Sequence, residues 1–126
     1  MTPKNLADVA ALTAQGESFD LALRNFLDVF YARPEASLLA SEPASLNATV
    51  PTLGLVEDAY LAATAEWLAT QFHLPLPAWT AAEHRKLHRP WFASPLASLR
   101  AVLLLESPAP FRARNLFVSE NALTRA

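Results

Sequence analysis

The sequence lacks cysteine and isoleucine entirely and contains only two glycines among its 126 residues. Without cysteine, the chain cannot form a disulfide scaffold, a thiol nucleophile or a thiolate-ligated zinc or iron–sulfur site. Two glycines provide little material for a glycine-rich phosphate loop or a nucleophile elbow, and neither motif occurs. We therefore expect a protein that is not an enzyme and that uses no cofactor.

Long apolar runs are absent as well. Charged residues interrupt every stretch that approaches the ~20 apolar residues needed to cross a bilayer. The most strongly apolar uninterrupted run is the pentapeptide 101–105, and the N-terminal residues lack the basic start and the apolar stretch of a signal peptide. These absences predict a cytoplasmic protein without a membrane partner.

Alanine and leucine dominate what is present. They contribute 25 and 22 residues, against six valines and eight threonines. Because alanine and leucine favour helices whereas β-branched residues favour strands, this composition predicts an all-α fold. A chain of this length can bury a core that needs no disulfide or structural metal. We expect one domain over residues 1–126, built as a bundle of five or six helices.

Apolar periodicity and helix-capping residues indicate where the helices lie. The expected helices cover about 5–15, 19–30 after Ser18 as N-cap, 34–40, 52 or 53 to 73, 95–106 after Ser94 as N-cap, and a last one capped by Ser119. The helix ending at 73 is apolar on two sides, which predicts a central position in the bundle. We expect residues 41–51 to form an extended linker and the proline-rich segment at about 74–95 to be irregular.

One apolar series lies within the expected helix 95–106. It consists of Leu96, Leu99, Val102, Leu103 and Leu105. This spacing predicts that the helix is buried in the core.

The net charge of −2 conceals an uneven distribution along the chain. Residues 1–70 contain nine acidic and three basic side chains, a balance of −6, whereas residues 71–126 contain seven basic and three acidic ones, a balance of +4. Opposite charges favour attraction between the two parts within one fold. The alternative is that the basic part binds an acidic protein or a nucleic acid.

The basic part contains arginines interleaved with aromatic residues near the end of the chain. The candidate partner-binding residues here are Arg112, Arg114, Asn115, Phe117 and Arg125. Such a pattern is typical of protein interfaces and of RNA recognition. It is equally compatible with a tail that folds back on the bundle, with its arginines exposed or paired with acidic side chains.

Trp79 and Trp91 lie in the proline-rich segment, and Phe92 follows the second of them. Large aromatic residues are favoured anchors at interfaces, so we include both tryptophans among the candidate partner-binding residues. The alternative is that these rings attach the irregular segment to the bundle.

His84 and His88 have the i, i+4 spacing that can direct two imidazoles at one metal ion, and Glu83 offers a carboxylate. Arg85, Lys86 and Arg89 surround them, and their positive charge opposes cation binding. We therefore expect no metal site here and interpret this segment as a solvated basic face, with a metal site as the weaker alternative. The adjacent Glu57 and Asp58 are interpreted as the solvated first turn of a helix, because neighbouring helical positions point in different directions.

The C-terminal block also carries a resemblance. Residues 99–108, 111–118 and 121–126, together with 77–79 and 90–92, resemble small bacterial proteins encoded beside nucleotidyltransferase-type toxins in type II toxin–antitoxin systems. The resemblance implies an antitoxin-like protein that binds its partner directly and has no catalytic residues. The alternatives are a nucleic-acid-binding accessory protein that uses the same arginines, or a small metal-binding protein.

The mechanism expected from this resemblance is electrostatic. A nucleotidyltransferase holds Mg²⁺–nucleotide with carboxylates, so the mouth of its active site is acidic. We expect Arg112, Arg114 and Arg125 to cover that mouth, aided by the segment of Trp79 and Trp91.

Overall fold

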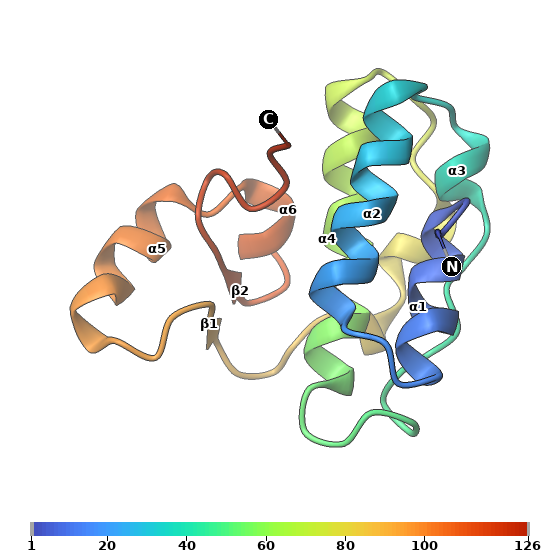
Figure 1. The fold of residues 1–126 in the computed structure, drawn as a ribbon. Helices are drawn as coiled ribbons and strands as arrows, with labels where there is room; N and C mark the ends of the chain where they lie inside the picture. The colour runs from blue at the N-terminus through green and yellow to red at the C-terminus, as the bar shows by residue number, and fades with distance from the viewer. Residues whose placement is uncertain (1, 126) are drawn as a thin grey trace.

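A computed structural model describes residues 2–125. These residues form six α-helices, three 3-10 helices and two short strands (Figure 1). The α-helices are α1 (Leu6–Ala14), α2 (Phe19–Ala32), α3 (Ser37–Ala40), α4 (Gly54–Gln71), α5 (Arg100–Glu106) and α6 (Ala109–Arg112). The 3-10 helices are η1 (Ala78–Ala81), η2 (Glu83–Arg85) and η3 (Ala97–Leu99), and the strands are β1 (Trp91–Phe92) and β2 (Leu116–Phe117). The predicted all-α fold class is confirmed.

Side-chain caps begin the first two helices. The Asn5 side chain accepts a hydrogen bond from the Asp8 N–H, and the Ser18 hydroxyl accepts one from the Leu21 N–H. These bonds satisfy backbone donors that have no partner within the helix. Between the helices, Gly16 adopts a φ of 103°, which a residue with a side chain rarely does. The predicted cap at Ser18 is confirmed.

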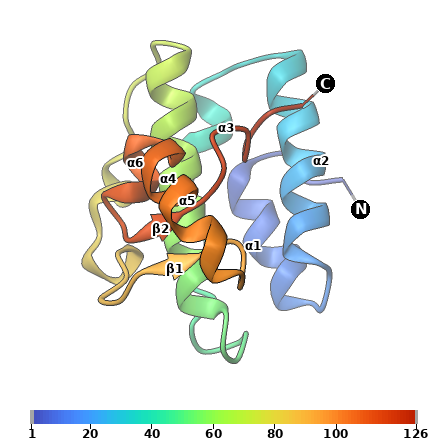
Figure 2. The ribbon, with the colours of Figure 1, turned by 90° about the vertical axis from the view of Figure 1, so that its left-hand side faces the viewer.

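Helix α4 is the central element. Buried residues occur on all its sides, and every position from 61 to 65 is buried. On one side, α2 packs against it through the Phe19–Tyr60 pair, whose ring centroids lie 5.8 Å apart. On other sides α4 contacts η1, η2, α6 and β2. Figure 2 shows α6 and the strands in front of α4, with α1 and α2 beside it. The predicted central position is confirmed.

The segment 41–51 is irregular, but it is not the free linker that we predicted. Leu46 within it is buried, and the fully buried carboxylate of Asp58 accepts hydrogen bonds from the Leu46 N–H at 2.7 Å and the Ser45 hydroxyl at 2.8 Å. Interpreting Asp58 as solvated is therefore wrong. The sequence gives no local sign of this contact, because it joins the side chain of a helix to a backbone twelve residues earlier.

A second buried charge lies nearby. Arg85 in η2 is 0% exposed, although the sequence predicted it on a solvated face. Its guanidinium donates to the carbonyls of Asp58 at 3.0 Å and Pro43 at 2.6 Å, and it lies 4.8 Å from the ring centroid of Trp79. Trp79 is also buried, and its indole N–H donates to the Leu39 carbonyl. The tryptophan thus attaches the irregular segment to the bundle, which was the alternative interpretation.

The C-terminal region differs most from expectation. The predicted helix capped by Ser119 is wrong, because residues 120–123 form turns and Leu116–Phe117 form β2, which pairs in parallel with β1. The predicted helix 95–106 begins only at Arg100, after η3. Of its five apolar positions, only Leu103 is buried, so the prediction that this helix is core is also wrong.

None of the helices within residues 2–125 combines the length and the apolar content that a bilayer crossing requires.

Replacing Arg85 by alanine should lower the free energy of unfolding by about 3 kcal/mol or more, because it leaves the buried Pro43 carbonyl without its donor and opens a cavity. Urea denaturation followed by circular dichroism measures this. Arg89→Ala is the matched control: this exposed arginine belongs to the same segment, and its removal should change stability by no more than about 0.5 kcal/mol. Equal stabilities of the two variants would contradict the structural role of Arg85.

Replacing Gly54 by alanine should destabilise the protein by about 1–3 kcal/mol, although alanine is the better helix former. A Cβ at this position would lie 2.8 Å from the Asn47 Cα and would also meet the Leu46 carbonyl oxygen. Thermal unfolding measures the effect. A variant as stable as the parent would show that 41–51 can move away from α4.

Candidate functional site

Arg114, which we predicted to bind a partner, is buried and bonds to other parts of the same chain. It is 4% exposed and forms an ion pair with Glu66 of α4 at 2.8 Å. The guanidinium also donates to the carbonyls of Pro110 and Thr80. A side chain held in this way cannot reach another molecule, so assigning Arg114 to a partner surface is wrong.

Arg125 lies at the surface but is also engaged. It forms two hydrogen bonds with the Asp28 carboxylate of α2, at 2.8 and 3.1 Å. This contact lowers the pKa of Asp28 and raises the pKa of Arg125. A partner could use Arg125 only by breaking this pair.

Among residues 2–125, three ion pairs join the acidic and basic parts of the chain. They are Glu42–Arg85, Glu66–Arg114 and Asp28–Arg125. The acidic and the basic part of the chain therefore attract each other within the fold, and the prediction of internal attraction is confirmed.

Asn115 and Phe117 also serve the fold. Asn115 has a φ of 62°, and its side-chain amide donates to the Leu87 carbonyl at 2.7 Å. The ring of Phe117 stacks on Phe92 across the two strands, with centroids 5.1 Å apart. Of the predicted partner-binding residues, only Arg112 is exposed without an ion pair in the described chain, and Trp91 is half-buried.

His84, His88 and Glu83 are exposed, but they do not form a helical pair with a third ligand. Helix η2 ends at Arg85 and the chain then becomes extended, so the i, i+4 spacing does not place both imidazoles on one face. Within residues 2–125, no three His, Asp or Glu side chains come close enough to hold a metal ion. The two histidines instead line a hollow of about 580 Å³, together with Leu55 and Trp91.

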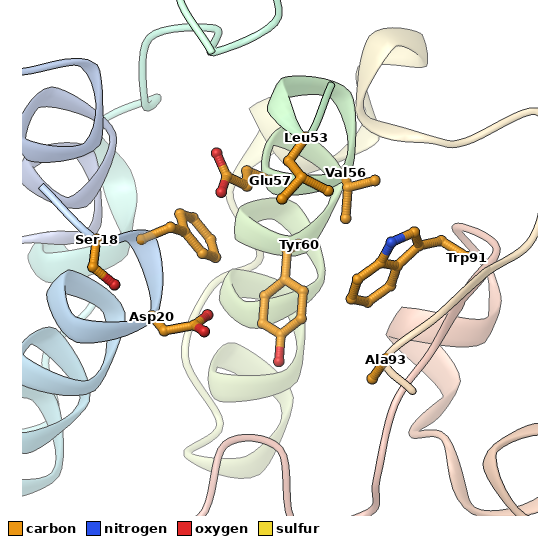
Figure 3. A pocket seen from close by; sticks show the side chains of 9 residues that line it. Ser18, Asp20, Leu53, Val56, Glu57, Tyr60, Trp91 and Ala93 are labelled. Atoms are coloured by element: carbon orange, nitrogen blue, oxygen red, sulfur yellow. The ribbon is translucent and has the colours of Figure 1, made fainter. Parts of the chain in front are cut away.

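A second hollow, of about 390 Å³, lies on the other side of Trp91, between the start of α2 and β1. We call it the α2–β1 hollow. Figure 3 shows the Tyr60 ring between Asp20 of α2 and Trp91 of β1, with the Asp20 carboxylate pointing toward Tyr60. Glu57 lines the hollow one helical turn before Tyr60. Sequence reasoning missed this site, because Asp20 and Glu57 look like ordinary solvated acids.

Two acidic side chains and no basic ones line the α2–β1 hollow. Burial raises the pKa of Glu57 to about 7, and repulsion from Asp20 and Asp58 adds to the effect. One Glu57 carboxylate oxygen is inaccessible to water and has no hydrogen-bond partner among the described residues. Burial, followed by repulsion from Asp20, also raises the pKa of Tyr60 to about 12. Glu57 is therefore only partly solvated, whereas the sequence predicted a solvated side chain.

Exposed large aliphatic side chains are concentrated on α5 and the residues before it. It consists of Leu96, Leu99, Val102, Leu104 and Leu105, which we call the α5 ridge. Their exposed fractions run from 40% at Leu99 to 83% at Leu105. Figure 1 shows α5 standing away from the α1–α4 bundle. Arg100 at the start of α5 is exposed, and its guanidinium lies 5.2 Å from the Phe92 ring centroid.

Comparisons of the chain with protein-family models, with curated proteins and with solved structures return no match.

Replacing Glu57 by glutamine should flatten part of the pH dependence of stability. Because the pKa of Glu57 is raised, the folded state binds the Glu57 proton more tightly than the unfolded state does. The protonated Glu57 therefore stabilises the fold fully below about pH 4.5, and this stabilisation is lost as the pH rises to about 7. Glu57→Gln cannot ionise and should therefore exceed the parent in stability by about 1 kcal/mol near pH 8, a value reduced for partial solvent screening. Urea denaturation at several pH values measures it, and the exposed Glu120→Gln should show no such trend. A constant difference at all pH values would contradict the raised pKa.

Proposed function

We propose that this chain is a non-enzymatic cytoplasmic protein that acts by binding a partner protein through the α5 ridge. The observation that carries the proposal is the exposure of five large aliphatic side chains on one short segment. Monomeric proteins rarely expose so many large aliphatic side chains within ten residues unless another molecule covers them. The proposed binding surface is therefore the α5 ridge and not the arginine-rich tail that follows it.

Two exposed arginines near the α5 ridge bear on the chemistry of the partner, while Glu106 is an acidic neighbour at the end of α5. Arg100 lies within the ridge segment, and Arg112 lies in α6, which follows α5 after two residues. Both are exposed, and neither forms an ion pair within the described chain. A complementary partner surface has an apolar groove for the leucines and acidic groups at its rim.

A nucleotidyltransferase-type toxin fits this description, and the resemblance of the C-terminal block favours it as the partner. Its active site needs carboxylates to hold Mg²⁺–nucleotide, which supplies the acidic rim. In this proposal the α5 ridge occupies the apolar part of the groove, while Arg100 and Arg112 neutralise the carboxylates. The antitoxin-like role therefore rests on apolar burial, with charge providing orientation and specificity.

A nucleic-acid partner is less well supported. Arg114 and Arg125, two of the three arginines that would contact phosphates, are already paired with carboxylates. An apolar ridge also offers no compensation for the dehydration of a phosphate backbone. We keep this alternative as an outcome of the experiment below.

The test replaces Leu105, the most exposed ridge residue, by glutamate. Leu105→Glu should weaken binding to the toxin encoded by the neighbouring gene by roughly tenfold or more, because a carboxylate would be buried in an apolar, acid-rimmed groove. Co-purification and growth rescue on co-expression measure it. Leu76→Glu is the matched control, since Leu76 is 57% exposed and follows α4 rather than belonging to α5.

Three results would overturn the proposal. The first is equal loss of binding in both variants, or in neither. The second is a dimer of this chain that Leu105→Glu dissociates, which would assign the ridge to a second copy. The third is steeply salt-dependent binding of DNA or RNA that Arg112→Glu abolishes, which would favour the nucleic-acid alternative.

A further inference from the structure

The α2–β1 hollow has walls of three aromatic rings that the fold holds in place. Phe19 packs edge-on against Tyr60, with ring centroids 5.8 Å apart, and Tyr60 packs in the same way on Phe111 at 4.9 Å. Trp91 is held by the pairing of β1 with β2. Figure 3 shows Tyr60 as the floor between Asp20 and Trp91. A site with such fixed walls requires little ordering when a ligand enters.

The charges on these walls have one sign. Asp20 and Glu57 line the hollow, and no lysine, arginine or histidine lies among its lining residues. One Glu57 oxygen is shielded from water without a hydrogen-bond partner. The hollow therefore combines negatively charged side chains with the electron-rich faces of aromatic rings.

We propose that the α2–β1 hollow binds an organic ammonium ion that carries an apolar body. The ammonium group pairs with the Asp20 carboxylate near the Tyr60 ring, while Glu57 contributes its negative charge from the turn before. The apolar body lies against Trp91 and Val56, which line the same hollow. Carboxylates together with aromatic faces are the two groups that attract organic cations most strongly.

Other ligand classes fit less well. A metal ion needs more oxygen ligands than the hollow provides, and the described residues contain no cluster of three acidic or histidine side chains suited to one. An anion would be repelled by both carboxylates, which offset the attraction of the α2 N-terminus. The volume of about 390 Å³ suits a small molecule rather than a bare ion.

Binding of such a cation should be linked to the proton on Glu57. A positive charge favours the ionised carboxylate, so binding lowers the pKa of Glu57 from about 7 and the affinity rises with pH through this range. The groups that oppose Glu57 ionisation are Asp20 on α2 and Asp58 on α4. Glu17 lines the adjoining hollow with Glu57, whereas the basic Lys86 and Arg89 line the separate hollow beyond Trp91.

The experiment compares phenethylammonium with phenethyl alcohol, a neutral molecule of the same shape, by NMR titration of the intact chain. The ammonium should bind roughly tenfold more tightly near pH 8, and this preference should shrink near pH 6. Asp20→Asn should reduce the preference at both pH values. Glu57→Gln should reduce it and remove its pH dependence. The exposed Glu120→Gln, which lies outside the hollow, is the matched control and should leave both unchanged.

Equal binding of the alcohol, or equal losses in the Asp20 and Glu120 variants, would overturn the proposal. Tighter binding of an N-acetyl-lysine amide than of phenethylammonium would assign the hollow to a lysine of a protein rather than to a small amine. Leu105→Glu should not change amine binding, so this proposal and the proposed partner surface fail or hold separately.

Discussion

The fold depends on the burial of one guanidinium. Arg85 lies beneath the surface with its charge on the Trp79 ring, and it donates to backbone carbonyls of two other segments. A buried charge is costly unless polar partners replace its lost hydration, so these partners must stay where they are. The segment 41–51, α4 and the proline-rich segment are thereby fixed relative to one another. The buried Asp58 carboxylate accepts a hydrogen bond from the Leu46 N–H and so adds a second contact between α4 and the segment 41–51.

Ion pairs within the chain also decide which surface groups remain free to bind another molecule. Arg114 and Arg125 form ion pairs with carboxylates of α4 and α2, so these two arginines of the basic tail stabilise the fold. The apolar α5 ridge and the acidic, aromatic α2–β1 hollow are among the surface features that these ion pairs leave free. Their chemistries differ, since one favours burial of aliphatic area and the other favours positive charge. The two proposals follow from this difference and do not depend on each other.

Local signals predicted the elements that local physics determines. The cap at Ser18 and the apolar series after it located α2, and the two-sided pattern of α4 predicted its central place. The same reasoning was wrong for α5, because apolar spacing shows which residues share a face but not whether anything covers that face. It also could not find the α2–β1 hollow, whose walls come from residues 18–20, 53–60 and 91–93. Nothing in any one of these segments indicates that the other two lie beside it.

The sequence by itself determined the helical class, the approximate positions of α1, α2 and α4, and the attraction between an acidic and a basic part, because composition, capping and net charge act locally or through sums. Only the tertiary structure decided which arginines form ion pairs with the acidic part. An ion pair requires that two side chains from distant parts of the chain come within a few ångströms of each other. It likewise decided that the most apolar run of the sequence lies at the surface, since burial depends on what packs against a helix and not on the helix alone.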